Sequence, residues 1–345
     1  MASDKALRVG VIGCGNIAQH AHLPSIHRTE GERLVAVADN FEDLARAVAR
    51  RYGLEEKDAH ADWRALIARK DIDAVVNLSL TPAHAETTIA ALEAGKHVLV
   101  EKPMAVTSEE ARRMAGAAAR TGRTLMIAFN HTYDPAAEYV KALIERGELG
   151  EILHAEVFFY DDRDAWDAGA LRRSLASAQP KPKWWPEDPR LGLLHYIHNY
   201  DSHVINLMRY LLGEPAGLDY CRWTPWKQLC AVFDYGAYRA VFKNVHTKQR
   251  RFEKGIEVAG TKKRAIIELA PPLERYAPGR VTVIDAEAQT VTQPLLEYRW
   301  PFEREHEHFV ACLRDGTKPR TDGASCVADV AIAEDLVRRA MGDRA

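Results

Sequence analysis

Apolar and polar positions in the first 130 residues come in blocks that predict a regular succession of strands and helices. Short apolar runs rich in β-branched residues predict buried strands at Leu7–Ile12, Leu34–Ala38, Ile72–Leu78, His97–Val100 and Thr124–Phe129. Helical spacing predicts helices at Phe41–Tyr52, Trp63–Ala68 and Ala83–Ala94, and a further helix that Ser108 opens as its N-cap. Strands that alternate with helices over short connections predict a parallel, doubly wound sheet.

The second half of the chain follows another pattern. Period-two alternation predicts antiparallel strands within Ile152–Tyr160, Ala231–Val245, Ile256–Ala259, Ala265–Leu269 and Val281–Asp285, with a hairpin turn at Gly260–Lys263. Long helices are predicted at Leu191–Leu212, Glu303–Leu313 and Ala324–Arg339. We therefore expect one domain over residues 1–130 and an α+β domain over residues 131–345, with a final helix able to pack back on the first domain.

A glycine pattern follows the first predicted strand directly. Gly13, Gly15 and Ala18 have the spacing G-x-G-x-x-A. Gly13 permits a tight turn, Gly15 lets the backbone approach a pyrophosphate, and Ala18 keeps the next helix close to the strand. That helix begins at Asn16 and Ile17, and its N-terminus attracts phosphate charge. The order of strand, glycines, helix and second strand predicts a dinucleotide site.

A carboxylate ends the second strand of this unit. Asp39 lies about twenty residues beyond the glycines, where it is expected to accept hydrogen bonds from the adenosine ribose. Because a carboxylate there repels a 2′-phosphate, the sequence favours NAD, and NADP is the less favoured cofactor.

Composition narrows the classes of partner and compartment. The chain has 345 residues and a formal net charge of −2, so its overall charge indicates neither a nucleic acid nor an anionic membrane as a partner. No apolar run approaches the roughly eighteen residues that a membrane span needs, and the N-terminus lacks a signal-peptide core. The 5 cysteines are scattered and never form C-x-x-C, which favours reduced thiols in the cytoplasm.

Three polar sites follow predicted strands, at the sheet edge where ligands of such folds bind. They are Thr81-Pro82-Ala83-His84, Glu101-Lys102-Pro103 and Asn130-His131. From the first two sites and from Asn130 we expect cofactor contacts, and from His131 a substrate contact. His84 has a plainer alternative role, which is to cap the backbone at a helix start.

Lys102 is the strongest candidate for acid–base chemistry among these residues. Pro103 restricts the backbone beside it, so the lysine is able to point into the expected cleft. Near the cofactor its amine is expected to hydrogen-bond a substrate hydroxyl or carbonyl, and burial brings a lysine pKa toward the working range. The alternative is an ordinary surface lysine in a loop.

Several blocks of the sequence resemble the Gfo/Idh/MocA family of nicotinamide-dependent sugar and cyclitol dehydrogenases. They are the glycine pattern, T-P-x-x-H at Thr81–His84, AGKHVLVEKPMA at Ala94–Ala105, Phe129-Asn130, ERGELG at Glu145–Gly150 and the tail Phe302–Ala333. The resemblance implies a Rossmann domain followed by a domain with a large open, mostly antiparallel sheet that commonly forms homodimers or homotetramers. It also implies that Lys102 lies beside the nicotinamide.

The helix predicted at Leu191–Leu212 carries a polar stripe. His195, Asn199, His203 and Asn206 recur at spacings of four, four and three, which places them on one face. In the family that the chain resembles, this helix bears D-x-x-x-H with the histidine as general base. His203 then takes the histidine position and Asn199 the aspartate position.

The amide at Asn199 is a departure from that pattern. An aspartate raises the basicity of its histidine, whereas an amide mainly orients the ring, so Lys102 is expected to carry more of the proton transfer. His195 and His198 are expected to contact the substrate. These histidines also allow a metal site, but no carboxylate or cysteine completes a set, so we predict no metal.

The stretch from Asp161 to Arg190 is long and irregular. Its length favours a functional loop. The tryptophans Trp166, Trp184 and Trp185 either stack on a sugar face or pack within a surface loop or subunit contact.

We therefore expect an NAD-dependent dehydrogenase that oxidises a secondary hydroxyl of a sugar, glycoside or cyclitol, with Lys102 and His203 handling the proton. One alternative is a lyase or glycosidase that keeps NAD bound through a transient oxidation and elimination. Another is a non-enzymatic NAD-binding sensor. The expected partners are a small carbohydrate substrate and further copies of this chain.

Overall fold

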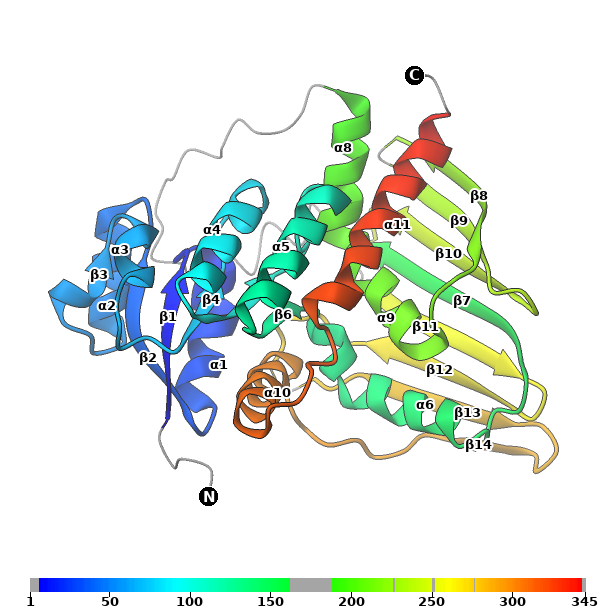
Figure 1. The fold of residues 1–345 in the computed structure, drawn as a ribbon. Helices are drawn as coiled ribbons and strands as arrows, with labels where there is room; N and C mark the ends of the chain where they lie inside the picture. Colours follow the sequence, from blue (N-terminus) through cyan, green and yellow to red (C-terminus); the bar gives the residue numbers. More distant parts are fainter. Residues whose placement is uncertain (1–5, 162–187, 226, 250–251, 276, 343–345) are drawn as a thin grey trace. The chain divides into compact units, whose positions relative to one another are not determined.

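The computed structural model describes residues 6–161, 188–225, 227–249, 252–275 and 277–342 (Figure 1). The described chain divides into two compact units. Unit 1 contains residues 6–129 and Phe302–Ala331, and unit 2 contains residues 130–161, 188–301 and 332–342. Each unit has its own sheet and its own buried core.

The sheet of unit 1 is parallel, as the alternation of strands and helices predicted. Its described strands lie in the order β3-β2-β1-β4-β5-β6. They are β1 (Leu7–Ile12), β2 (Glu32–Ala38), β3 (Ala59–His60), β4 (Ala74–Asn77), β5 (His97–Glu101) and β6 (Leu125–Ala128). The strand order reverses between β1 and β4, which is where ligands of doubly wound sheets bind.

Unit 1 also contains the helices that connect these strands, together with α10 from a later part of the chain. They are α1 (Leu23–Arg28), α2 (Glu42–Arg51), α3 (Trp63–Ile67), α4 (Thr81–Glu93), α5 (Ser108–Thr121) and α10 (Pro301–Asp315). Val9, Val11, Val75 and Val76 in the central strands are 0% exposed, so these strands are covered on both faces. This double burial explains why they read as continuous apolar runs.

The start of α5 differs from its prediction. The N-cap is Thr107, whose hydroxyl accepts a 3.2 Å hydrogen bond from the backbone N–H of Glu110, and the Glu110 carboxylate in turn accepts from the N–H of Thr107. Ser108 is the first helical residue and is not the cap. The Glu110 side chain completes a capping box that a cap at Ser108 would not allow.

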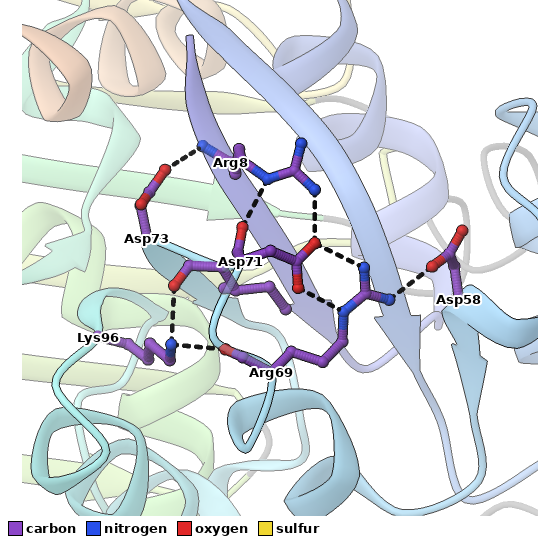
Figure 2. Close-up of polar contacts among 7 residues, drawn as sticks. Arg8, Asp58, Arg69, Asp71, Asp73 and Lys96 are labelled. Atoms are coloured by element: carbon purple, nitrogen blue, oxygen red, sulfur yellow. Dashed lines mark hydrogen bonds and ion pairs between the residues drawn. The ribbon is translucent and has the colours of Figure 1, made fainter. Parts of the chain in front are cut away.

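A cluster of charges closes the end of the unit 1 sheet opposite the ligand edge (Figure 2). Asp71 pairs with Arg8 at 2.5 Å and with Arg69 at 2.9 Å, and Arg69 also pairs with Asp58 at 2.6 Å. The ammonium of Lys96 donates to the backbone carbonyls of Arg69 (2.7 Å) and Ile72 (2.8 Å). Because these contacts tie β1, β4 and β5 together away from the ligand edge, we assign the cluster a structural role.

Lys96→Met is expected to lower the free energy of unfolding by about 1–3 kcal/mol, because two carbonyl oxygens, one buried and one partly buried, lose their donor. Cofactor affinity is expected to stay at the wild-type value. Urea unfolding and NADH titration measure the two effects. Lys70→Met, at an exposed position of the same loop, is the matched control. A variant at Lys96 that is as stable as this control would contradict the assignment.

The sheet of unit 2 is mostly antiparallel. Its described strands lie in the order β14-β13-β12-β11-β7-β10-β9-β8. They are β7 (Ile152–Asp161), β8 (Gly217–Thr224), β9 (Gln228–Asp234), β10 (Arg239–His246), β11 (Glu253–Gly260), β12 (Lys263–Leu269), β13 (Arg280–Asp285) and β14 (Thr290–Thr292). β10 and β7 are parallel to each other, whereas the other neighbouring pairs are antiparallel.

The alternating stretch Ala231–Val245 contains two strands, β9 and β10, joined by a turn at Tyr235–Tyr238. The hairpin predicted at Gly260–Lys263 joins β11 and β12 as expected. The helices of unit 2 are α6 (Pro135–Glu145), α8 (Pro189–Tyr196) and α9 (Ser202–Leu212). α11 (Gly323–Met341) contributes Cys326 and Val330 to the core of unit 1 and Leu336 to that of unit 2. In the described part of the chain, we find no helix long and apolar enough to cross a membrane.

Candidate functional site

The glycine loop between β1 and the next helix has the geometry that its spacing predicted. Gly13 has φ +93°, and a Cβ atom there would lie 2.4 Å from the backbone oxygen of Leu78. Only glycine fits this turn. A Cβ atom on Gly15 would meet nothing within 4 Å, so the loop has open space beside Gly15. That space is what a pyrophosphate needs to approach the backbone.

The helix after the loop begins at Asn16 and includes a π-helical turn at Ala18–His22 before α1. Ala18 is 0% exposed, as expected for a residue that lets the helix lie close to the sheet. The side chain of Gln19 donates to the carbonyl of Cys14 at 2.7 Å and so braces the loop against the helix. The helix N-terminus adds the partial positive charge that favours a phosphate group.

Asp39 lies at the end of β2, and its carboxylate is held from two sides. It accepts a 2.8 Å hydrogen bond from the backbone N–H of Cys14 and a 2.9 Å bond from that of Phe41. Sequence reasoning gave Asp39 only a ligand contact, but the same side chain also fixes the glycine loop. Burial, followed by the charge of Asp39, raises the pKa of the Cys14 thiol, so this cysteine is a neutral packing residue.

His84 lies in the first turn of α4, after Thr81 and Pro82, and is 1% exposed. Its ring nitrogens lie 2.8 Å from the carbonyl oxygen of Pro103 and 2.9 Å from that of Ser79. Burial lowers the pKa of His84. The ring therefore links the loops after β4 and β5, and its predicted contact with the cofactor stays a prediction.

Lys102 directly follows β5, and its side chain is half-buried. The backbone N–H of Lys102 donates to the Glu101 carboxylate at 2.8 Å. Removal from water lowers the pKa of the Lys102 amine, and the negative charge of Glu101 opposes this only in part. A larger share of the amine is therefore neutral near physiological pH than for an exposed lysine, which suits acid–base work.

Asn130 and His131 lie in a 3₁₀ turn of unit 2 (Asn130–Tyr133) and are both buried. Within the described residues, neither the oxygen nor the nitrogen of the Asn130 side chain has a hydrogen-bond partner, although Asn130 is only 1% exposed. A buried amide without partners is costly, and a ligand that pairs with both atoms removes the cost. The contact predicted between Asn130 and a nicotinamide cofactor stays a prediction.

The predicted polar helix contains a π-helical turn at Ile197–Asp201, between α8 and α9. π turns insert one residue and are frequent at functional sites. The amide of Asn199 donates to the backbone carbonyl of His195 at 2.8 Å. The ring of His203 lies 4.7 Å from that of His131 between centroids, so these two predicted residues do meet.

Asp201 and His198 lie on the same π turn and are almost fully buried. Asp201 accepts a hydrogen bond from the side chain of Asn244 on β10. The carbonyl of His198 accepts from the hydroxyl of Ser202 at 2.7 Å. Asp201 therefore anchors this turn to the sheet of unit 2.

Trp166, Trp184 and Trp185 lie outside the described residues. Among the residues that are described, no three histidine, cysteine or acidic side chains are placed to hold a metal ion. The five cysteines are all free thiols.

Part of the chain is similar to known oxidoreductases. Residues 7–129 match the model of an oxidoreductase family with an NAD-binding Rossmann fold. The levoglucosan dehydrogenase of Pseudarthrobacter phenanthrenivorans is 35% identical over 179 residues, which cover 52% of this chain and 42% of that protein. The chain thus matches less than half the length of this curated relative, and the same holds for several inositol 2-dehydrogenases.

Two further similarities extend over nearly the whole chain. The inositol 2-dehydrogenase of Rhizobium meliloti is 27% identical over 352 aligned positions, covering 96% of each protein. The crystal structure of an aldose-aldose oxidoreductase from Caulobacter crescentus has a TM-score of 0.80 at 20% identity and covers 98% of each chain, which shows the shared fold. Residues 7–129 thus match the Gfo/Idh/MocA family of oxidoreductases as its NAD-binding Rossmann region, and the fold shared with the solved structure extends over the rest of the chain.

Proposed function

We propose that this protein is an NAD-dependent dehydrogenase that oxidises a secondary hydroxyl of a sugar, glycoside or cyclitol, or reduces the matching ketone. The observation that carries the proposal is Lys102, a half-buried amine with a lowered pKa directly after β5 of a dinucleotide-binding sheet. Relatives named for levoglucosan and inositol support the carbohydrate class.

The residues present fit a nicotinamide dinucleotide. The open space beside Gly15 supports a pyrophosphate contact, the carboxylate of Asp39, hydrogen-bonded to the same loop, supports a contact with the adenosine ribose, and the unsatisfied amide of Asn130 supports a further ligand contact. When bound, the nicotinamide supplies hydride chemistry that no side chain provides. The protein contributes binding, orientation and proton transfer.

The proton chemistry falls to the chain's own residues. In oxidation, the neutral amine of Lys102 accepts the proton of the substrate hydroxyl, and in reduction its ammonium returns a proton to the carbonyl oxygen. We assign His203 to share this proton and Asn199 to orient His203 or a neighbouring substrate hydroxyl. Because Asn199 carries no charge, His203 is the weaker base and Lys102 the principal one.

Asp39→Ser is expected to weaken the preference for NADH over NADPH by at least about tenfold, because the carboxylate no longer repels the 2′-phosphate. Fluorescence titration of the variant with each reduced cofactor measures the ratio of dissociation constants. Asp43→Ser, in the first turn of α2, is the matched control and is expected to keep the wild-type ratio. An unchanged ratio in Asp39→Ser would remove Asp39 from the adenosine site.

The activity is tested by following NADH absorbance with a panel of sugars, glycosides and cyclitols. Accumulation of NADH with one of them supports the dehydrogenase. Product formation from a glycoside without accumulating NADH would replace it with a lyase or glycosidase that keeps NAD bound. Cofactor binding without turnover of any panel member, in either direction, would favour a sensor.

We also propose that copies of this chain associate through the face of the unit 2 sheet opposite the one on which α6 and α9 pack. Ala155, Val157 and Phe159 on β7 point toward the helices and are buried, whereas the alternating Glu156 and Phe158 remain half-buried on the other face. A sheet face of this kind is suited to a second copy.

A further inference from the structure

Four ionisable side chains buried in unit 1 form one row of hydrogen bonds. The Glu101 carboxylate lies 3.0 Å from Nε2 of His22, and Nδ1 of His22 lies 3.0 Å from Nε2 of His306. Nδ1 of His306 then lies 2.9 Å from a carboxylate oxygen of Glu32. We call Glu32, His306, His22 and Glu101 the buried relay.

The buried relay is closed to water along most of its length. The side chains of His22, His306 and Glu32 are 0% exposed, and that of Glu101 is 9% exposed. The ring of Phe302 packs edge-on against His22 at 5.4 Å between centroids. The four residues come from β2, the π turn before α1, β5 and α10, so the fold of unit 1 assembles them.

The number of protons in this row follows from its geometry. Each of the three hydrogen bonds needs one proton, and ionised carboxylates only accept. Two neutral histidines carry two protons in total, so the row holds one more. With both carboxylates ionised, two arrangements satisfy every atom, one with this proton on His22 and one with it on His306. We place it on His306, because its Nδ1 lies within 3.2 Å of both oxygens of Glu32. His22 is then neutral and donates from Nε2 to Glu101. His306 then carries protons on both nitrogens and donates to His22 and to Glu32.

The surrounding charges agree with this placement. Burial lowers the pKa of His22, which favours its neutral form. Glu305, next to His306, is 0% exposed, and among the described residues its carboxyl oxygens have no hydrogen-bond partner. Burial and then the charge of Glu101 raise the pKa of Glu305, so it is a neutral acid that adds no charge. His84 is likewise held neutral by burial.

We propose that the buried relay holds one proton as a His306 imidazolium and thereby keeps the Glu101 carboxylate ionised and fixed against Lys102. His22, His306 and Glu32 are then positioning residues for the amine, an inference that rests on the proposed role of Lys102. The second oxygen of Glu101 accepts the backbone N–H of Lys102 at 2.8 Å, which joins the relay to the lysine.

The electrostatics of Glu101 support this role. The pKa of the Glu101 carboxyl is lowered: burial by itself raises it, but the hydrogen bond from His22 and the positive charge of Lys102 act in the opposite direction. The His306 imidazolium is nearer to Glu101 along the relay than the Glu32 carboxylate is, so the net charge of that pair also favours ionised Glu101. An ionised Glu101 in turn stabilises the ammonium form of Lys102.

Glu32→Gln removes the need for the additional proton and keeps the hydrogen bonds of the relay. A glutamine amide donates to Nδ1 of His306, so His306 then donates from Nε2 to His22 and both rings are neutral. All three hydrogen bonds remain, but the imidazolium is no longer needed. Glu303→Gln is the matched control. Glu303 lies on the same helix as His306, α10, and its carboxylate pairs with Arg28 at 2.7 Å outside the relay.

Nitrogen-15 NMR of the full-length, histidine-labelled protein at pH 8 tests the proton directly. We expect one buried ring with both nitrogens protonated in the wild type and in Glu303→Gln, and none in Glu32→Gln. The loss of the same signal in His306→Asn assigns it. Two neutral rings in the wild type, or an imidazolium that persists in Glu32→Gln, would overturn the proposal. This result does not depend on whether Lys102 is catalytic.

The pH profile of ketone reduction tests the positioning role. In this direction activity falls at high pH because the ammonium of Lys102 loses its proton. We expect the fall at low pH to follow the protonation of Glu101. Loss of the imidazolium raises the pKa of Glu101, so we expect the acid midpoint of Glu32→Gln to rise by about half a pH unit, a roughly threefold loss of activity on that limb. A midpoint equal to that of Glu303→Gln would reduce the relay to a packing role.

Discussion

Replacing Lys102 with methionine is expected to lower kcat by about 10²- to 10⁴-fold, the usual contribution of a positioned acid–base group. Methionine keeps the length and apolar character of the side chain but cannot carry a proton. Since the expected loss concerns proton transfer, the dissociation constant of NADH is expected to change by no more than about twofold. Steady-state rates with the substrate found in the panel, together with NADH titration, measure the two effects separately.

The control for Lys102→Met is Lys57→Met, at an exposed lysine of the same unit. It is expected to match the wild type in both measurements. Full activity in Lys102→Met would end the role assigned to this amine. A large loss of NADH affinity without a loss of kcat would instead make Lys102 a cofactor-binding residue.

The pH dependence of the wild type follows from the lowered pKa of Lys102. In oxidation the neutral amine is the active form, so kcat is expected to rise with pH through the pKa of Lys102. In reduction the ammonium is the active form, so kcat is expected to fall through the same midpoint. Because the pKa is lowered, this midpoint lies below that of an exposed lysine, and Lys102→Met is expected to remove both dependences.

The sequence predicted the parallel sheet well because its strands are buried on both faces. Such strands appear as unbroken apolar runs, and β1 has the bounds that were expected, Leu7–Ile12. The glycine loop could also be predicted from the sequence, because the positive φ of Gly13 and the open space at Gly15 each require a particular residue type at one position.

The antiparallel half was harder to predict. Its period-two alternation continues through the tight turn at Tyr235–Tyr238, so β9 and β10 appeared as a single stretch. Helix α6 went unassigned, although Asp134 caps it and Pro135 is its first residue. The cap of α5 was misplaced by one residue because both Thr107 and Ser108 are good N-caps, and only the reciprocal bond of Glu110 distinguishes them.

Of the buried relay, the sequence analysis singled out Glu101, in Glu101-Lys102-Pro103, but nothing linked it to Glu32, His22 and His306. His22 and His306 are 284 positions apart, and no spacing rule connects them. A π turn also disturbs the spacing of four that placed His195, Asn199 and His203 on one stripe. Contacts of this kind depend on tertiary packing, so only the folded chain reveals them.

Gly13→Ala and Gly15→Ala are expected to separate the folding role of the glycine loop from its binding role. Gly13→Ala is expected to destabilise the full chain by about 2–4 kcal/mol, because strained backbone alone costs about 1–3 kcal/mol and the methyl group also meets the Leu78 oxygen. Urea unfolding measures this loss. A variant as stable as the wild type would mean that the turn can relax at little cost.

Gly15→Ala is expected to unfold at the same urea concentration as the wild type, since its methyl group enters open space. The same methyl group would occupy the place that a pyrophosphate needs, so the affinity for NADH is expected to fall by about 10- to 100-fold, or about 1.4–2.8 kcal/mol. NADH titration of the folded variant measures this loss. Wild-type affinity in Gly15→Ala would place the dinucleotide away from this loop, and the role proposed for Asp39 would be lost with it, because its carboxylate is fixed to the same backbone through Cys14.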